Sequence, residues 1–293
     1  MEQKARLSFH DEIRKNKILS VLLIFVVFVV LVCLIYVIGL AMGLDIFFIL
    51  IIAIVFSLIY VWSGYFFSDK IAIASVGGKE ANQNQYRQYH DLVEGLCLAS
   101  GMPKPRLYIM NSPEINAFAT GRDPQHAVIC VTTGALEKLN KQELEGVLSH
   151  ELSHIANFDI RFMTLVAVLV GMISIIAEIF LRSLWFRDSD SDNKGNAIFL
   201  VIGIVLAILA PIVVQLVQLA ISRKREYAAD SSAVKFTRTP TGLIGALKKI
   251  KQNHDMKVSG AVSPLFIASP KKLAVLFSTH PPLEDRIAKL ERM

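Results

Sequence analysis

The chain has 293 residues, of which 53% are hydrophobic, and its mean hydropathy is +0.49. These values exceed what a soluble domain of this length needs, so they exclude an ordinary water-soluble protein and indicate a membrane protein. In a membrane protein, the formal net charge of +6 indicates first which segments face the cytoplasm. No nucleic-acid partner is expected, because no basic cluster is interleaved with aromatic residues.

Two long apolar runs follow a basic segment at the N-terminus. Residues 1–17 are polar and basic, and residues 18–42 and 46–67 are apolar, with a short turn between them. Each run reaches the roughly 20 residues that a membrane-spanning helix needs. We therefore predict a transmembrane hairpin over 18–67. Lysine and arginine crowd its N-terminal side and are absent from the turn, which predicts that the N-terminus and the segment after the hairpin face the cytoplasm.

The three cysteines agree with a cytoplasmic placement of the polar parts. Cys33, Cys97 and Cys130 form no paired spacing. An odd number of unpaired cysteines gives no disulfide framework, so the polar parts are expected in a reducing compartment.

Residues 68–160 are soluble in character and predict a small sheet. A helix is expected over 85–100, ended by Gly101. Strand patterns rich in β-branched residues occupy 105–110 and 127–132, and 115–120 is predicted as a third strand at the edge.

The stretch His150-Glu151-Leu152-Ser153-His154 reads H-E-x-x-H and follows this sheet. Positions four apart share one face of a helix, so the two imidazoles can aim at one point, which suits a tetrahedral zinc ion. Glu151 is then placed to take a proton from a metal-bound water. Asn140 and Glu143 form a capping-box pattern for this helix. Asn157 and Asp159 are expected to shape its end.

Two further apolar runs, 162–181 and 197–221, come next. They are predicted as hydrophobic helices that either span the membrane or form a hydrophobic cap beside the site. Residues 222–293 are again polar, with helical patterns at 241–252 and 282–292. Residues 68–293 are therefore taken as one catalytic domain interrupted by these two helices.

A catalytic zinc site usually has three protein ligands and an open position. If both later runs span, the residues just after 221 return to the membrane face on which the H-E-x-x-H helix lies. Glu226 and Asp230 lie there, four apart on one predicted helical face. Glu226 can ligate zinc and Asp230 can orient a ligand histidine. The alternative is an exposed acidic face beside basic residues.

Three separate segments carry a resemblance to a known family. The segments are 150–159, 222–230, and Thr279-His280-Pro281-Pro282 with Arg286. Together they resemble the HtpX family of bacterial membrane zinc endopeptidases, which is related to the CAAX prenyl proteases. The resemblance covers nearly the whole chain, including the hairpin and the Asn116-Ala117-Phe118-Ala119 stretch.

That resemblance implies a function and a set of site residues. Glu226 would be the third zinc ligand, Asp230 its supporting partner, and His280 and Arg286 would lie near the active site and hold substrate or the developing oxyanion. For His280 the plainer alternative is a turn residue before two prolines. Asn116 and Ala117 belong to the edge strand along which an extended substrate is expected to bind.

The fold class expected is an α-helical membrane protein with an α+β, zincin-like catalytic domain. The function expected is a zinc-dependent endopeptidase in the bacterial inner membrane, multi-pass, with its active site facing the cytoplasm. Its partners would be the lipid bilayer and damaged membrane proteins or unfolded polypeptides. A non-catalytic scaffold or chaperone with a structural zinc is the main alternative, and it would need a fourth protein ligand. A small transporter would need more polar groups in the apolar runs than this chain has.

Overall fold

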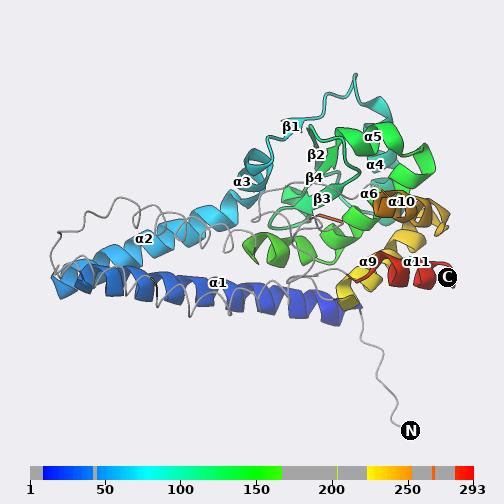
Figure 1. Ribbon diagram of the computed structural model, residues 1–293. Helices are drawn as coiled ribbons and strands as arrows, with labels where there is room; N and C mark the ends of the chain where they lie inside the picture. Colours follow the sequence, from blue (N-terminus) through cyan, green and yellow to red (C-terminus); the bar gives the residue numbers. More distant parts are fainter. Residues whose placement is uncertain (1–8, 42–44, 167–202, 204–222, 253–265, 268–280) are drawn as a thin grey trace, which may run out of the picture.

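The structure is a computed structural model that describes residues 9–41, 45–166, 203, 223–252, 266–267 and 281–293. Two long helices lie side by side and run out from one end of a mixed α+β domain (Figure 1). The domain combines a four-stranded sheet with several helices. The described part is therefore mostly helical, with a small sheet, as the sequence predicted.

The two long helices are α1 (Phe9–Ala41) and α2 (Ile46–Phe66). They pack through one stripe each, because buried residues recur at helical spacing: Leu23, Val27 and Leu31 on α1, and Ile49, Ala53 and Ser57 on α2. Their other faces carry large exposed apolar side chains, such as Phe25 at 62% and Phe47 at 76% exposure. An apolar surface of this extent is unfavourable in water and is suited to lipid.

Within the described residues, α2 is the helix that is long and apolar enough to cross a membrane. The apolar stretch of α1, Ser20–Cys33, is shorter. Helix α1 begins at Phe9, so the second half of the basic segment 1–17 is helical. The predicted helix over 162–181 is described only in part, with helical structure over 159–166. Apart from residue 203, the run 197–221 lies outside the described residues.

The sheet has the strand order β1-β2-β4-β3. Strand β2 (Arg106–Met110) runs parallel to β4 (Val128–Thr132), while β1 (Lys79–Glu80) and β3 (Ala117–Thr120) run antiparallel to their neighbours. The three predicted strands are confirmed within two residues, and β3 is an edge strand. The short β1 was not predicted, because two exposed residues after a Gly-Gly turn carry no periodic signal.

Helices cover the sheet and connect it to the long apolar helices α1 and α2. Helix α3 (Ser68–Ser75) continues from α2, and α4 (Arg87–Ser100) ends at Gly101 in the left-handed conformation, as predicted. Short helices η1 (Pro124–His126) and α5 (Thr133–Lys138) flank β4. Further helices in the described part of the chain are α6 (Lys141–Ala156), α9 (Arg223–Thr237), α10 (Thr241–Gln252) and α11 (Leu283–Leu290).

Helix α6 is the centre of the domain and packs against α10, α9, α4 and β3. Its side chains Leu148, Leu152 and Ile155 are at most 1% exposed, and burial of each contributes about 1.5–3 kcal/mol. Helices α6 and α10 also touch through their backbones. A Cβ on Gly146 would collide with the backbone of Gly242 and Leu243. Helix α6 is therefore held rigidly on several sides.

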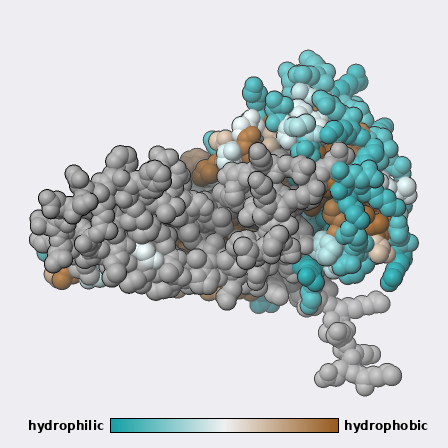
Figure 2. All heavy atoms as spheres, in the orientation of Figure 1, coloured by the Kyte–Doolittle hydropathy of each residue, from teal (hydrophilic) through white to brown (hydrophobic). Residues whose placement is uncertain are grey.

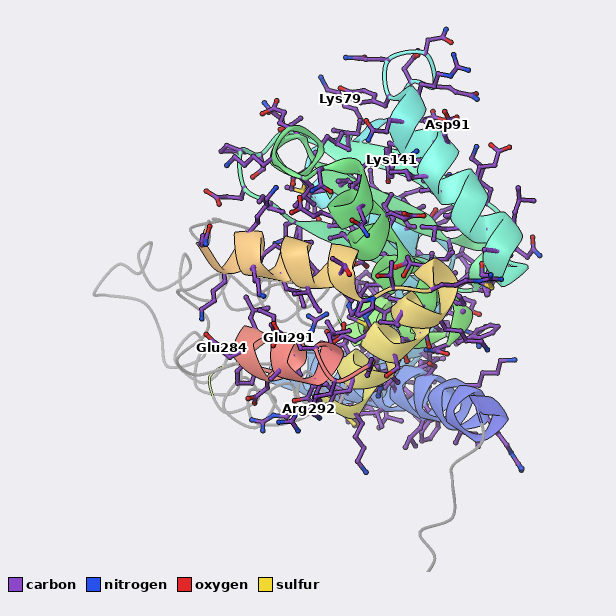
Figure 3. All side chains as sticks on the ribbon, turned by 90° about the vertical axis from the view of Figure 1, so that its right-hand side faces the viewer. Lys79, Asp91, Lys141, Glu284, Glu291 and Arg292 are labelled. Carbon is purple, nitrogen blue, oxygen red and sulfur yellow. The ribbon has the colours of Figure 1, made fainter. Side chains whose placement is uncertain are left out.

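The outer surface of this domain is polar. In the view of Figure 2 its described atoms are mostly hydrophilic. Figure 3 shows charged side chains projecting outward, among them Glu284 on α11 and Glu291 just after it. These two carboxylates pair with Lys251 and Lys248 of α10 at 2.7 and 3.0 Å. A polar domain attached to an apolar helical pair is the expected construction for a membrane-anchored enzyme.

Candidate metal centre

Helix α6 places His150 and His154 one turn apart on a buried face. Its start is fixed by the predicted capping box, in which Asn140 accepts from the Glu143 backbone N–H and the Glu143 carboxylate accepts from the Asn140 backbone N–H. His150 is 1% and His154 5% exposed. Buried imidazoles need polar partners, because polar groups are costly to bury alone, and at this spacing one side chain can be a partner of both rings.

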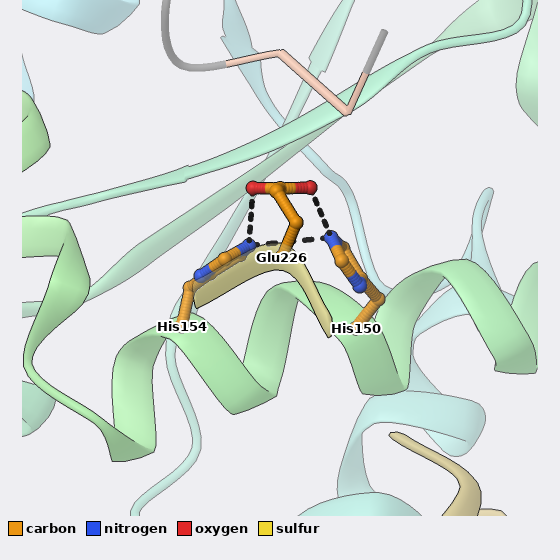
Figure 4. A group of neighbouring side chains, drawn as sticks. All are labelled: His150, His154 and Glu226. Atoms are coloured by element: carbon orange, nitrogen blue, oxygen red, sulfur yellow. Dashed lines mark hydrogen bonds and ion pairs between the residues drawn. The ribbon is translucent and has the colours of Figure 1, made fainter. Parts of the chain in front are cut away.

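Glu226 of α9 is that partner (Figure 4). Its two carboxylate oxygens lie 3.6 Å from Nε2 of His150 and 3.5 Å from Nε2 of His154. The two Nε2 atoms are 3.2 Å apart. Ligands about 2.1 Å from a tetrahedral zinc ion lie roughly 3.4 Å from one another, so the three side chains form a triangle of the size that zinc requires.

The acidic pair on α9 is buried rather than exposed. Glu226 is 1% and Asp230 2% exposed, so the alternative of a solvated acidic face is wrong. The signal was the four-residue spacing between them, which places both carboxylates toward α6.

Asp230 and Arg286 both contact the His150 ring. Oδ1 of Asp230 lies 3.0 Å from Nδ1 of His150. The fully buried Arg286 donates to both Asp230 oxygens, at 2.6 and 2.9 Å, and its Nη1 lies 3.3 Å from Glu226. A carboxylate at Nδ1 fixes the ring so that Nε2 offers its lone pair to the metal.

Asp159 supports His154 in the same way, and the sequence reading missed this role. Its carboxylate lies 3.0 Å from Nδ1 of His154 and is 1% exposed. The chain can return to the helix because Phe158, just past the end of α6, has φ of +59°, a conformation rare for a bulky residue. The available signal was a carboxylate five residues after the second histidine. It pointed only to the helix end, because a turn of this kind is not encoded by periodicity.

Burial and neighbouring charges shift the pKa values of the two histidines apart. Burial, reinforced by Arg286, lowers the pKa of His150 to about 4, against the opposing effect of Asp230. Burial also acts to lower the pKa of His154, but its hydrogen bond with Asp159 and the charge of Glu226 outweigh it and raise the value to about 9. A metal ion held by the three ligands would take the place of that proton, because a metal ligand must be deprotonated.

Glu151 lies on the same buried face and is 2% exposed. Burial raises the pKa of its carboxyl to about 7, although the charge of His154 and a hydrogen bond from the Ala119 backbone N–H act to lower it. The structure therefore brings strand β3 directly against the H-E-x-x-H helix, in agreement with the packing of α6 on β3.

The predicted substrate residues Asn116 and Ala117 begin this edge strand and are buried. The Asn116 side chain accepts from the Ala117 N–H at 3.0 Å. On the outer edge of β3, the Ala117 carbonyl accepts from the Ile267 N–H at 3.0 Å, and Phe118 bridges to Phe266. This edge is thus already contacted in part by the chain's own 266–267 segment. His280 lies outside the described residues.

Among the residues that the structure describes, the metal-binding group comprises three side chains, His150, His154 and Glu226. Three ligands leave a position for water or substrate, as in catalytic zinc sites. The closed, four-ligand site that a structural zinc would need is not found in this part of the chain.

Comparisons with known proteins agree with this geometry. The model of peptidase family M48 matches residues 83–293. A protease HtpX homolog of Caldanaerobacter subterraneus subsp. tengcongensis is 46% identical over 247 residues, covering 82% of this chain and 83% of the relative. One from Streptococcus uberis is 40% identical over 255 residues, covering 83% of this chain and 86% of the relative.

A solved structure has the same fold at low sequence identity. The crystal structure of S. mikatae Ste24p aligns with a TM-score of 0.52 and 18% identity, over 95% of this chain and 66% of that one. Because the family model covers most of the chain and the zinc ligands are intact, the chain belongs to peptidase family M48, as a membrane zinc metallopeptidase of the HtpX type that binds its metal through His150, His154 and Glu226.

Proposed function

We propose that this metallopeptidase is a multi-pass endopeptidase of the bacterial inner membrane that degrades damaged or misfolded membrane proteins from the cytoplasmic side. The observation that carries the proposal is the direct connection of the zinc domain, through α3, to the exposed apolar helix α2. A site held beside a membrane helix meets polypeptides that emerge from the bilayer. The resemblance to HtpX-type proteases, which covers 82% of this chain in one relative, supports the quality-control role.

Zinc, when bound, supplies a Lewis acid that polarises the scissile carbonyl and lowers the pKa of water. The chain's own residues do the rest. Glu151 accepts a proton from the attacking water and delivers it to the leaving amine, a role that suits a buried carboxylate one residue from a metal ligand. Its contact with the Ala119 N–H ties it to β3, so the proton acceptor and the proposed substrate strand keep one geometry.

The supporting residues keep both imidazoles in the tautomer that binds a metal. Asp230 and Asp159 each accept a hydrogen bond from a histidine Nδ1, which leaves Nε2 as the ligand atom. Arg286 compensates the charge of Asp230 and Glu226 at the back of the site. Its guanidinium is fully buried, so a role in holding substrate requires it to act through these carboxylates or the Ile267 carbonyl, which it also contacts.

Substrate is proposed to bind as an extended strand at the outer edge of β3, near Asn116 and Ala117. Main-chain pairing of this kind accepts many sequences, which suits the removal of damaged proteins. The Ala117 carbonyl already accepts a hydrogen bond from the Ile267 N–H. An incoming peptide must therefore either displace this hydrogen bond or pair with the part of β3 that follows Ala117. His280 stays a predicted participant.

The test is cleavage in a bilayer. The purified full chain, loaded with zinc in proteoliposomes, is given one helical membrane protein in its folded form and after heat denaturation. We expect cleavage of the denatured form only, and a loss of about 10²–10⁴-fold in Glu151→Gln with zinc retained. Equal cleavage of folded and denatured substrate would remove the quality-control role, and a fully active Glu151→Gln would remove the mechanism.

Orientation is tested separately. A reporter fused after Met293 should be active in the cytoplasm, as should one placed in 77–159. A reporter placed between 188 and 195 tests whether the apolar runs 162–181 and 197–221 cross the membrane. If they cross it, the reporter lies on the far side of the membrane, and if they form a cap, the reporter stays in the cytoplasm.

A further inference from the structure

A second charged site, which shares no residue with the zinc ligands, lies where α2 meets the polar domain. A cavity of about 280 Å³ opens beside the end of this helix, and its walls include Phe67, Lys70, Lys104, Arg106, Arg122 and His126. Four of these side chains are permanently cationic. Nothing in the hydrolysis chemistry uses them, so their convergence needs a separate explanation.

The charges in this cavity, which we call the α2-end pocket, are only partly compensated. Asp69 is the one carboxylate in its wall and pairs with Arg106. Just outside, Glu94 pairs with Lys104 at 2.8 Å, and Asp123 lies 3.6 Å from Arg122. In the described part of the chain Lys70 has no carboxylate partner, and its ammonium lies 5.4 Å from the centre of the Phe67 ring.

The pocket also has the position of a membrane–water boundary. Phe66 is the last residue of α2, and Arg122 donates to its carbonyl at 3.2 Å while lying 5.0 Å from its ring. Trp62 packs against Phe66 and Phe67 with ring centres 5.0 and 5.8 Å away. Trp and Tyr gather at the headgroup level of bilayers, and Lys and Arg there meet anionic lipid.

We infer that the α2-end pocket binds a phosphate group, presented at this depth by the headgroup of an anionic phospholipid. Arg and Lys donors match phosphate oxygens, and the aromatic residues beside them cover the apolar start of the acyl chains. The inference goes beyond the proposed function, because it concerns where the domain sits on the bilayer and not what it cleaves. A bound headgroup would hold the domain at a fixed height above the membrane.

The experiment uses native mass spectrometry of the detergent-purified full chain with added phosphatidylglycerol, phosphatidylcholine or inorganic phosphate. We expect phosphatidylglycerol to bind most tightly. Lys70→Gln should weaken that binding about fivefold, as expected for loss of one interfacial cation, and Lys70→Gln with Lys104→Gln should weaken it further. Lys141→Gln is the matched control, because Lys141 is also exposed and, at the start of α6, is not among the residues that line the pocket.

The outcomes separate the sources of phosphate. Equal binding of the two lipids, or binding unchanged in both Lys70 variants, overturns the inference. If inorganic phosphate displaces the lipid at a concentration similar to that of the lipid, the pocket is an anion site for a soluble ligand. That outcome overturns the lipid assignment. Lys70 is exposed and pairs with no carboxylate in the described structure, so its replacement should leave folding and zinc content intact.

Discussion

The Asp159 carboxylate lies 3.0 Å from Nδ1 of His154 and turns the opposite nitrogen of that ring toward Glu226. Asp230 stands in the same relation to His150. Each ligand histidine therefore has its own carboxylate partner, one from the turn after α6 and one from α9. This pairing makes the orientation of the metal ligands depend on residues that never touch the metal.

Asp159→Asn should weaken zinc binding about 10–100-fold, because an amide oxygen accepts the His154 hydrogen bond less strongly than a carboxylate. Asp230→Asn should have an effect of similar size. Zinc affinity is measured by competition with a chromophoric chelator. Asp123→Asn is the control, since Asp123 also contacts a histidine, His126 at 2.8 Å, but on the surface. Unchanged affinity in Asp159→Asn would show that the helix alone orients His154.

Glu226→Gln should lose zinc and activity together. The substitution keeps the size of the side chain but removes the negative charge that helps to neutralise Zn²⁺, and amides are poor zinc ligands. Metal analysis of the purified variant, beside Glu151→Gln, separates a ligand from a proton acceptor. Full zinc content in Glu226→Gln, with loss in a His280 variant, would move the third ligand to His280.

Arg286→Met should lower the free energy of unfolding by about 3–5 kcal/mol, because it leaves Asp230 and Glu226 buried without their cation. Arg286→Lys should recover only part of this, since an ammonium cannot contact both oxygens of Asp230 in the planar geometry of a guanidinium. Thermal unfolding of the zinc-loaded proteins measures both. Arg292→Met, an exposed residue just past the end of α11, is the control. A normal melting temperature with lost activity would instead assign Arg286 to substrate alone.

Gly146→Ala should destabilise the protein by about 1–3 kcal/mol, because the added methyl group forces α10 away from α6. Gly95→Ala makes the same chemical change in the middle of α4, where a Cβ has open space. It should stabilise the protein by about 0.5–1 kcal/mol through helix propensity. Opposite shifts in the denaturant midpoint are the expected result. Equal, small shifts would mean that the two helices can separate without cost.

The sequence was most informative where one residue pattern determines the local structure. The H-E-x-x-H spacing, the Asn140–Glu143 capping box and Gly101 at the end of α4 each encode a local geometry, and all appear as predicted. Topology and spacing made Glu226 a candidate third ligand but left an exposed acidic face as an alternative, and the family resemblance favoured the ligand, because the contact with the histidines is long-range. Arg286 was placed near the site by the same resemblance, but its salt bridge with Asp230 was not foreseen.

Some features had no sequence signal of their own. The left-handed conformation of Phe158 brings Asp159 back to His154. The residue types in that turn do not predict a positive φ at a bulky residue. The contact of Ile267 with Ala117 is likewise a tertiary pairing between distant segments. The α2-end pocket escaped notice because its cations come from α3 and from separate loops and strands.

The zinc ligands come from helices that are far apart in the chain, and this fixes the order in which a working enzyme can arise during translation. During translation His150 and His154 are synthesised before Glu226, and Arg286 is synthesised after it. Domains fold as their residues emerge, so a chain that stops before Glu226 holds the two histidines but no complete metal site. The three-ligand metal site therefore cannot form until α9 has been made, and zinc-dependent hydrolysis has to wait for that helix.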